Sequence, residues 1–220
     1  MVIDKTNTTL VIRTLGLIDY EACLHKMQQH VGSAKPSQQA ELWLVEHPSV
    51  YSQGQAGKIH HLLNTGKIAC VQSDRGGQVT YHGPGQLVCY FLFDLKVLGL
   101  NVRQLVNLTE ISVIQLLQQL GIAAHADSAK PGVYIQTAKI ASLGFRIRRH
   151  MSYHGVAINV NMDLSPFAGI NPCGLVQPIT QIADLVGSAR ANIVSIRELY
   201  LEQLLPIFGF KHGIITNIWP

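Results

Sequence analysis

Residues 75–86 read Arg-Gly-Gly-Gln-Val-Thr-Tyr-His-Gly-Pro-Gly-Gln, and the rest of the chain is arranged around them. The segment holds four glycines and one proline between two apolar runs, 68–71 and 87–93. Glycine allows positive φ and a close approach of the backbone to a ligand, whereas proline fixes one φ and removes one N–H donor. The pattern predicts a rigid loop that lines a ligand site between two strands. A plain hairpin connection with ordinary turn residues is the alternative.

Strands and helices are predicted on both sides of this loop from the spacing of apolar residues. The expected strands are 10–15, 42–46, 68–72, 87–94, 132–135, 139–147 and 156–162, and the expected helices are 19–30, 102–120 and 195–205. Asp19 is suited to cap the first helix, Gly121 to follow the second, and Pro206 to end the third. Residues 51–57 and 163–180 are expected to be irregular. Consecutive strands with helices set apart predict an α+β domain, a two-layer α/β arrangement in which a mixed or antiparallel sheet is covered by helices.

Composition favours a single cytoplasmic domain over residues 1–220. The chain is 47% apolar and 14% charged, and no linker-like segment divides it. Its apolar runs are too short to span a bilayer, and the N-terminal residues lack the pattern of a secretory signal, so no membrane association is expected. The net charge of +4 is modest, which gives little support for nucleic-acid binding.

Four cysteines lie at positions 23, 70, 89 and 173, without a C-x-x-C pair, so we expect free thiols and no metal site. Cys173 differs from the other three because it lies in an irregular segment, Asn171-Pro-Cys-Gly174. A thiol with a pKa of about 8.5 needs a nearby cation or base to act as a nucleophile near neutral pH. Lys139, His82 and His154 are the candidates for that group. An inert loop thiol is the alternative for Cys173.

Four segments together resemble the motifs of the lipoyl(octanoyl) transferases, a family also called lipoate-protein ligase B. They are residues 75–86, Lys139-Ile-Ala-Ser-Leu-Gly144, His154-Gly155 and Asn171-Pro-Cys-Gly174, in this order and at these separations. The resemblance runs from about residue 10 to at least residue 185. It is specific because four motifs agree in register, whereas any one of them alone would be weak.

This resemblance implies the fold shared by the catalytic domains of biotin and lipoate ligases. It also implies transfer of an octanoyl (or lipoyl) group from acyl carrier protein to a lysine of a lipoyl domain, the first step of endogenous protein lipoylation. The implied acceptors are the lipoyl domains of 2-oxoacid dehydrogenases and the glycine cleavage H protein. We expect a monomer that uses no cofactor and no metal.

Carried over residue by residue, the resemblance makes Cys173 the acyl-thioester nucleophile and Lys139 the group that lowers its pKa. The implied substrate-binding residues are Arg75, Gly76, Gly77, Gln78, Val79, Thr80, Tyr81, His82, Ser142, Leu143, Gly144, Gly155, Val156 and Ala157. Backbone N–H groups at 76–77, 143–144 and 174 are candidates to stabilise the oxyanion of the attacked carbonyl. When the acceptor lysine attacks, either Lys139 or His82 would take its proton.

Two other functions compete with this interpretation. One is an ATP-dependent lipoate or biotin ligase of the same fold, in which a lysine near Lys139 would hold the acyl-adenylate phosphate. The other is a binding protein that captures acyl chains or carrier protein without turnover. Such ligases need no nucleophilic cysteine, so Cys173 and the His82-Gly-Pro-Gly85 turn favour the transferase.

A basic segment, Arg146-Ile-Arg-Arg-His150, follows the strand that begins near Lys139. Strand alternation predicts that Arg146 and Arg148 project to one face, near the mouth of the active site. Because acyl carrier proteins are acidic, these residues would speed the encounter with the donor. A solvated strand end without a partner is the alternative.

Overall fold

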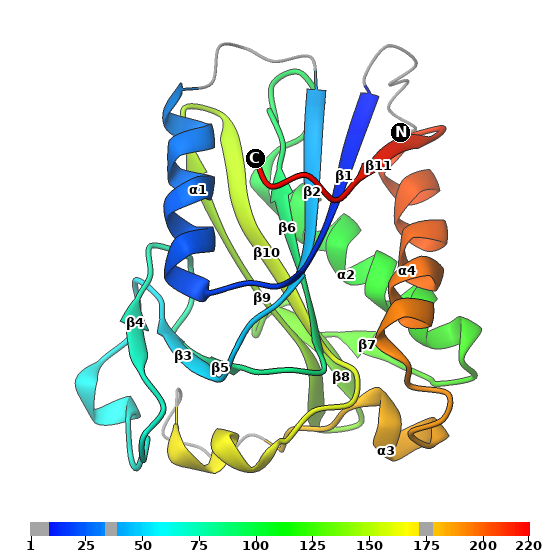
Figure 1. Ribbon diagram of the computed structural model, residues 1–220. Helices are drawn as coiled ribbons and strands as arrows, with labels where there is room; N and C mark the ends of the chain where they lie inside the picture. Colours follow the sequence, from blue (N-terminus) through cyan, green and yellow to red (C-terminus); the bar gives the residue numbers. More distant parts are fainter. Residues whose placement is uncertain (1–8, 34–38, 172–177) are drawn as a thin grey trace.

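A mixed sheet forms the centre of the molecule. The structure is a computed structural model that describes residues 9–33, 39–171 and 178–220. Within these residues the larger sheet has eight strands in the order β11-β1-β2-β6-β10-β9-β8-β7 (Figure 1). They are β1 (Thr9–Leu17), β2 (Gln39–Glu46), β6 (Gln86–Leu92), β7 (His125–Ala126), β8 (Gly132–Ile135), β9 (Ala138–Arg148), β10 (Met151–Asn159) and β11 (Gly213–Thr216). β1 is parallel to β2 and β11 and the other pairs are antiparallel, so the prediction of a mixed sheet is confirmed.

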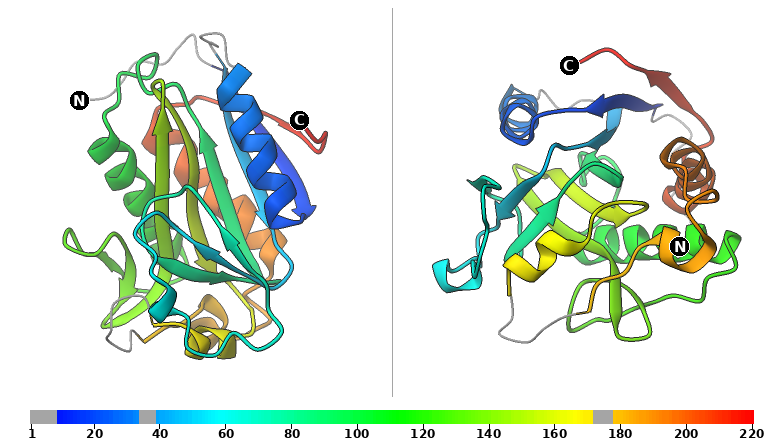
Figure 2. Two further views of the ribbon diagram at one scale, coloured as in Figure 1. Left: turned by 90° about the vertical axis from the view of Figure 1, so that its left-hand side faces the viewer. Right: turned by 60° about the horizontal axis from the view of Figure 1, so that its bottom comes forward.

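Helices cover both faces of this sheet (Figure 2). They are α1 (Tyr20–Ser33), α2 (Val102–Gln119), α3 (Ile182–Val186) and α4 (Ile193–Phe208), with 3₁₀ turns η1 (Ile59–His61) and η2 (Ser165–Gly169). Leu42 and Leu44 of β2 pack in the cluster that holds α2 and α4, whereas Trp43 and Val45 pack in the cluster that holds α1. The fold therefore has one layer more than the expected two-layer arrangement, because β2 and β6 are apolar on both faces and neither face can be left to water.

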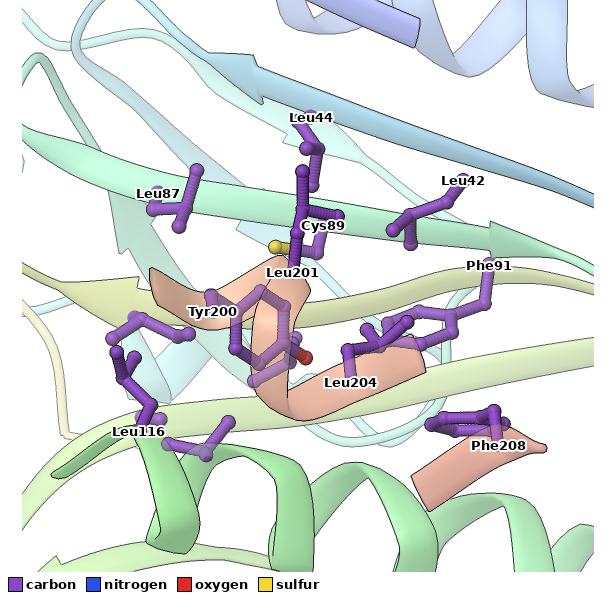
Figure 3. Close-up of a cluster of buried hydrophobic side chains, with 14 of the residues drawn as sticks. Leu42, Leu44, Leu87, Cys89, Phe91, Leu116, Tyr200, Leu201, Leu204 and Phe208 are labelled. Carbon is purple, nitrogen blue, oxygen red and sulfur yellow. The ribbon is translucent and has the colours of Figure 1, made fainter. Parts of the chain in front are cut away.

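The larger core lies between the sheet and the helices α2 and α4. Figure 3 shows Leu42, Leu44, Leu87, Cys89 and Phe91 of the strands facing Tyr200, Leu204 and Phe208 of α4 and Leu116 of α2. Each such side chain is almost fully buried, and burial of one Leu or Phe contributes roughly 1.5–3 kcal/mol. This core holds the strands β6, β10 and β9 rigidly in register, and they position the site described below.

The helix ends that sequence analysis predicted from capping residues agree with the structure, with one exception. Asp19 accepts a hydrogen bond from the Ala22 N–H, and Gly121 has φ +79° just after the end of α2, as expected of these residues. The prediction that the last helix ends near Pro206 is wrong, since α4 continues to Phe208 and ends at Gly209 in the left-handed conformation. A proline in the last turn removes one hydrogen bond, and the burial of Phe208 outweighs that loss.

A second sheet has three strands, of which sequence analysis predicted only the one at 68–72. It consists of β3 (Val50–Gln53), β4 (Cys70–Gln72) and β5 (Val79–His82), so the predicted loop 75–86 contains a strand and the predicted loop 51–57 begins with one. β3 and β5 pair antiparallel, with Ser52 opposite Thr80. The run from Val79 to His82 has the β-branched and aromatic residues typical of strands, but the flanking glycines obscured it.

The turn between β9 and β10 also differs from the prediction. Arg149 and His150 have φ of 50° and 70°, the positive values that a two-residue type I′ hairpin needs. β10 therefore begins at Met151 and not near Val156. Arg148 lies nine positions from Lys139 along one continuous strand, which separates them by about 30 Å. The expectation that Arg148 lies near the mouth of the active site is wrong for that reason.

Among the described helices, none combines the length and the apolar character that crossing a membrane requires.

Candidate functional site

A cavity of about 860 Å³ runs over β9, β10 and β6. Lys139 and every predicted substrate-binding residue except Tyr81 line it. Four segments far apart in the sequence thus meet at one cavity: the glycine-rich segment, the residues after Lys139, the residues after His154, and the residues on either side of 172–177.

Tyr81 lies on the other side of β5 from the cavity. Its hydroxyl lies 3.0 Å from that of Ser49, and its ring packs against Tyr51 and Phe167 at 5.6 and 5.5 Å between centroids. Its neighbours in the strand, Thr80 and His82, point to the opposite face and line the cavity. Tyr81 supports the wall of the cavity from behind.

Lys139 lines the cavity, and its backbone is held on both sides. Its N–H donates to the Pro178 carbonyl at 2.8 Å, and its carbonyl accepts from the Thr180 N–H at 3.0 Å. The ammonium lies 5.2 Å from the centroid of the Tyr134 ring, a cation–π distance. Gly132 passes beside the lysine so closely that a Cβ there would be 3.0 Å from Lys139 Cε. The side chain is thus held between an aromatic face and a backbone that carries no side chain.

Cys173 lies outside the described residues, together with the rest of 172–177. The described residues on either side, Asn171 and Pro178, both line the cavity. The Asn171 N–H donates to the His61 carbonyl at 2.8 Å, and Pro178 is the partner of Lys139.

The glycines at 76 and 144 bring two backbones together. The Gly76 N–H donates to the Phe145 carbonyl at 3.0 Å, on the edge of β9. A Cβ on Gly144 would lie 2.8 Å from the Gly76 carbonyl oxygen. The Gly76 N–H is therefore already bonded, and Phe145 lies six positions, about 20 Å, from Lys139 along β9. Gly76, which was a candidate donor to the oxyanion, is a backbone contact instead.

Arg75 and His82 are buried parts of the cavity wall. The Arg75 guanidinium donates to the carbonyl and hydroxyl oxygens of Ser52 at 2.5 and 2.9 Å. The two ring nitrogens of His82 lie 2.9 Å from Ser52 Oγ and 2.7 Å from Gln86 Oε1. Burial lowers the pKa of His82 well below its usual value. With both nitrogens bonded and its ring neutral, His82 is poorly suited to take a proton from a substrate.

His154 differs from His82, because only one of its ring nitrogens has a hydrogen-bond partner in the protein. Its Nε2 lies 2.8 Å from Asp74 Oδ1, whereas its buried Nδ1 has no hydrogen-bond partner. Burial alone would raise the pKa of Asp74, but hydrogen bonds from His154, Tyr153 and Gln28 lower it. Burial lowers the pKa of His154 despite the carboxylate. A neutral imidazole beside an ionised carboxylate carries its proton on Nε2, so Nδ1 is a hydrogen-bond acceptor.

Sequence analysis named His154 as one of three candidates for the group that activates Cys173 and quoted it in a motif, but it did not include it among the substrate-binding residues. Asp74 and Tyr134 were not singled out. The His154-Gly155 pair within a strand was an available signal, because histidine there is unusual. Asp74 and Tyr134 carry no such signal, since only the packing of distant strands brings them to the site.

The sequence of this chain is similar to one family model and to several known proteins. Residues 19–204 match the family model described as lipoyl protein ligase A/B catalytic domain. An octanoyltransferase of Pseudomonas putida (strain W619) is 53% identical over 189 residues, which cover 86% of this chain and 88% of that protein. An octanoyltransferase of Mannheimia succiniciproducens is 47% identical and covers 95% of this chain and 97% of its own length.

Solved structures with a similar fold are much more distant in sequence. The crystal structure of a lipoate-protein ligase A bound with ATP has a TM-score of 0.76 at 14% identity, covering 95% of this chain and 89% of that one. A bi-partite lipoate protein ligase from Thermoplasma acidophilum has a TM-score of 0.75 at 14% identity, and the match covers 96% of this chain and 88% of that one. At this identity the likeness is one of fold.

Proposed function

The chain belongs to the family of lipoyl protein ligase A/B catalytic domains and transfers octanoyl groups in protein lipoylation, and we propose that it does so through a thioester on Cys173. The donor would be octanoyl acyl carrier protein. The acceptor would be a lysine of a lipoyl domain, such as those of 2-oxoacid dehydrogenases or the glycine cleavage H protein.

One observation carries the proposal. Lys139 and the two residues that flank 172–177, Asn171 and Pro178, line the same cavity, and apolar or small side chains such as Val88 and Ala157 line it too. A cavity with both apolar side chains and a lysine suits an acyl thioester, because the chain can be buried while its carbonyl meets a polar group.

In the first step the Cys173 thiolate attacks the donor carbonyl. The new C–S bond forms as the bond to the carrier sulfur breaks, and the carrier leaves as a thiolate that takes a proton from the Lys139 ammonium. Lys139 is then neutral for the second step. Because one thioester replaces another, the exchange is close to neutral in free energy. Lys139 as an ammonium would favour the thiolate by its charge.

In the second step the amine of the acceptor lysine attacks the Cys173 thioester. An amide forms, the Cys173 thiolate leaves, and the proton lost by the amine must be accepted. Aminolysis of a thioester is downhill, so no ATP is needed. Lys139 in its neutral form is the proposed base, since the alternative, His82, has both ring nitrogens bonded.

The test is an incubation of the protein with octanoyl carrier protein in the absence of ATP, followed by intact mass and peptide mapping. We expect a gain of one octanoyl group at Cys173 and none in Cys173→Ser. Adduct at Cys23, Cys70 or Cys89 instead, or a requirement for ATP as in a ligase, would contradict the mechanism. A stable adduct that never passes to a lipoyl domain would indicate a binding protein.

A further inference from the structure

Three polar side chains lie buried behind the wall of the cavity. Ser52, Gln86 and Asn159 are each at most 4% exposed, and none of them lines the cavity. Burying an amide or a hydroxyl is unfavourable unless the group is hydrogen-bonded. The bonds that these residues make therefore account for their presence.

A chain of hydrogen bonds begins at Arg75, in the smaller sheet. The Arg75 guanidinium donates to Ser52 Oγ at 2.9 Å, and Ser52 Oγ lies 2.9 Å from His82 Nε2. Burial lowers the pKa of His82 well below its usual value, so the ring is neutral and only one of its nitrogens carries a proton. Because Ser52 Oγ accepts from the guanidinium, its own hydroxyl proton is available to His82 Nε2.

The chain continues through the larger sheet to Thr180. His82 Nδ1 lies 2.7 Å from Gln86 Oε1, an oxygen that can only accept, so the histidine proton is on Nδ1. Gln86 and Asn159 are opposite each other on β6 and β10, and the Gln86 amide donates to Asn159 Oδ1 at 2.9 Å. The Asn159 amide donates to the Thr180 carbonyl at 3.0 Å. Every bond therefore points the same way, from a buried cation to a backbone carbonyl, and bonds in such a series strengthen one another.

This series of bonds ends beside Lys139. β10 pairs with β9 only as far as Ile158, and residues 178–180 take its place next to Lys139. The N–H and the carbonyl of Lys139 both bond to that segment. On the other side of Lys139, the pairing of β8 with β9 has a register shift. The Asn159 amide therefore fixes the segment that holds the Lys139 backbone and that directly follows residues 172–177.

We propose that Asn159 is a positioning residue for octanoyl transfer, and that the series of bonds from Arg75 fixes the glycine-rich segment and the strand that carries Lys139 as one unit. This inference rests on the proposed function, which assigns the chemistry to Lys139 and Cys173. Asn159 does not line the cavity, so it acts through residues 178–180 and not on the substrate. The last bond needs a donor on Asn159, and this requirement can be tested apart from the packing of the side chain.

Two substitutions of similar shape separate the donor from the packing. Asn159→Leu removes both side-chain bonds, and it should lower the octanoyl transfer rate per folded molecule at least about tenfold at every pH, the effect of a misplaced catalytic group. Asn159→Asp can accept from Gln86, but it donates to the Thr180 carbonyl only while its carboxyl is protonated. Because burial raises the pKa of a carboxyl, its rate relative to the wild type should approach one at about pH 5.5 and fall at least about tenfold toward about pH 8.

Comparison with the wild type at each pH removes the titration of Lys139 and of the Cys173 thiol, which all these proteins share. Of the side chains in the series only Arg75 and His82 titrate, and burial keeps His82 neutral. Asn161→Asp is the matched control, because it makes the same change on an exposed residue two positions away. Its relative rate should not change with pH.

The direction of the bonds can also be measured in the wild type without turnover. Nitrogen-15 NMR of the His82 ring distinguishes the two tautomers, and we expect the proton on Nδ1. A proton on Nε2 would overturn the inference, as would an Asn159→Leu variant that keeps the wild-type rate or an Asn159→Asp variant that is no faster than Asn159→Leu at low pH. Acylation of the wild type at Cys173 in the test above keeps these outcomes separate from a failure of the proposed function.

Discussion

Gly132 lies where a side chain would displace Lys139. A Cβ there would be 3.0 Å from both Lys139 Cε and the Ala141 carbonyl, and Gly132 has φ +151°. We expect Gly132→Ala to lower octanoyl transfer by about 10²-fold, the effect of moving a catalytic group by about 1 Å. The measurement is the transfer rate per folded molecule.

Gly121→Ala is the matched control, because Gly121 also has positive φ but has open space around it. It should lose about 1–2 kcal/mol of stability from backbone strain alone and keep its transfer rate. Equal activity losses in both variants would show that Gly132 matters for folding and not for Lys139.

Lys139 is expected to act on Cys173 through its charge and on the acceptor through its proton. Lys139→Ala should raise the pKa of the Cys173 thiol and shift the pH profile of its alkylation upward. Lys139→Arg should keep the profile near that of the wild type, yet abolish transfer, because a guanidinium retains its proton. An unchanged profile in Lys139→Ala would mean that the two side chains are not neighbours.

At the residue scale, sequence analysis predicted which residues line the cavity, but it did not predict that several of them bond to other parts of the cavity wall. It placed Arg75, His82 and Gly76 at the cavity, and they line it. Their hydrogen bonds to Ser52, Gln86 and Phe145 could not be predicted, because each crosses between elements whose pairing the sequence does not state.

At the scale of elements, the length of β9 decides which cations lie near the donor. Lys130, in the loop before β8, is exposed and lines the cavity, whereas Arg148 lies at the opposite end of β9 from Lys139. We expect Lys130→Glu to lower kcat/KM with octanoyl carrier protein roughly three- to tenfold at low salt, because a charge at the rim chiefly steers encounter.

Arg148→Glu serves as the control and should leave this rate unchanged. A small octanoyl thioester should be used equally well by both variants. A loss with the small thioester in Lys130→Glu would show that Lys130 supports the cavity itself and does not act by steering.

The elements that sequence analysis found are those with a long regular pattern. α2 was predicted to within one residue, and β8 and β9 were predicted as a pair. β5 was missed because its four residues lie among glycines. The start of β10 was also missed, because Arg149 and His150 form a turn that usually has the sequence Asn-Gly.

At the scale of the whole molecule, buried neutral histidines make stability depend on pH. Burial lowers the pKa of His47 from 6.5 to about 4, and it also lowers the pKa values of His82 and His154. As the pH falls below about 6.5, the unfolded chain binds protons that the folded chain excludes, so the free energy of unfolding decreases until about pH 4. For His47 alone the loss is about 3 kcal/mol.

Urea unfolding at several pH values between 7.5 and 4.5 measures this loss, and the free energy of unfolding should fall steadily. Asp74 does not contribute in this window, because its lowered pKa affects stability only below its usual value of 3.8. His47→Gln should show a shallower slope. A free energy that is constant over the range would contradict the account.

The α+β class was predictable for the whole molecule, whereas the number of layers was not. Runs such as 87–93 are apolar at every position, which indicates burial on both faces of a strand, and the prediction did not use that signal. The pairing of β1 with β11 could not be predicted either, because β11 is a short, partly exposed strand that lies 203 positions after its partner, from Leu10 to Gly213.

The edge of the sheet at β1 affects the risk of aggregation during synthesis of the protein. β1 is paired on one side with β2, but its other side is covered by β11, with Leu10 opposite Gly213. Residues near β11 add to the cover, since Arg13 donates to the Ile218 carbonyl at 3.0 Å. A nascent chain therefore carries an open edge on β1 until β11 has been synthesised, and such edges recruit other chains. A chain that ends at Phe210 should aggregate, measured as an increase in light scattering over time, whereas the full chain should not. By covering the edge of β1, β11 thus protects the newly made protein from aggregation.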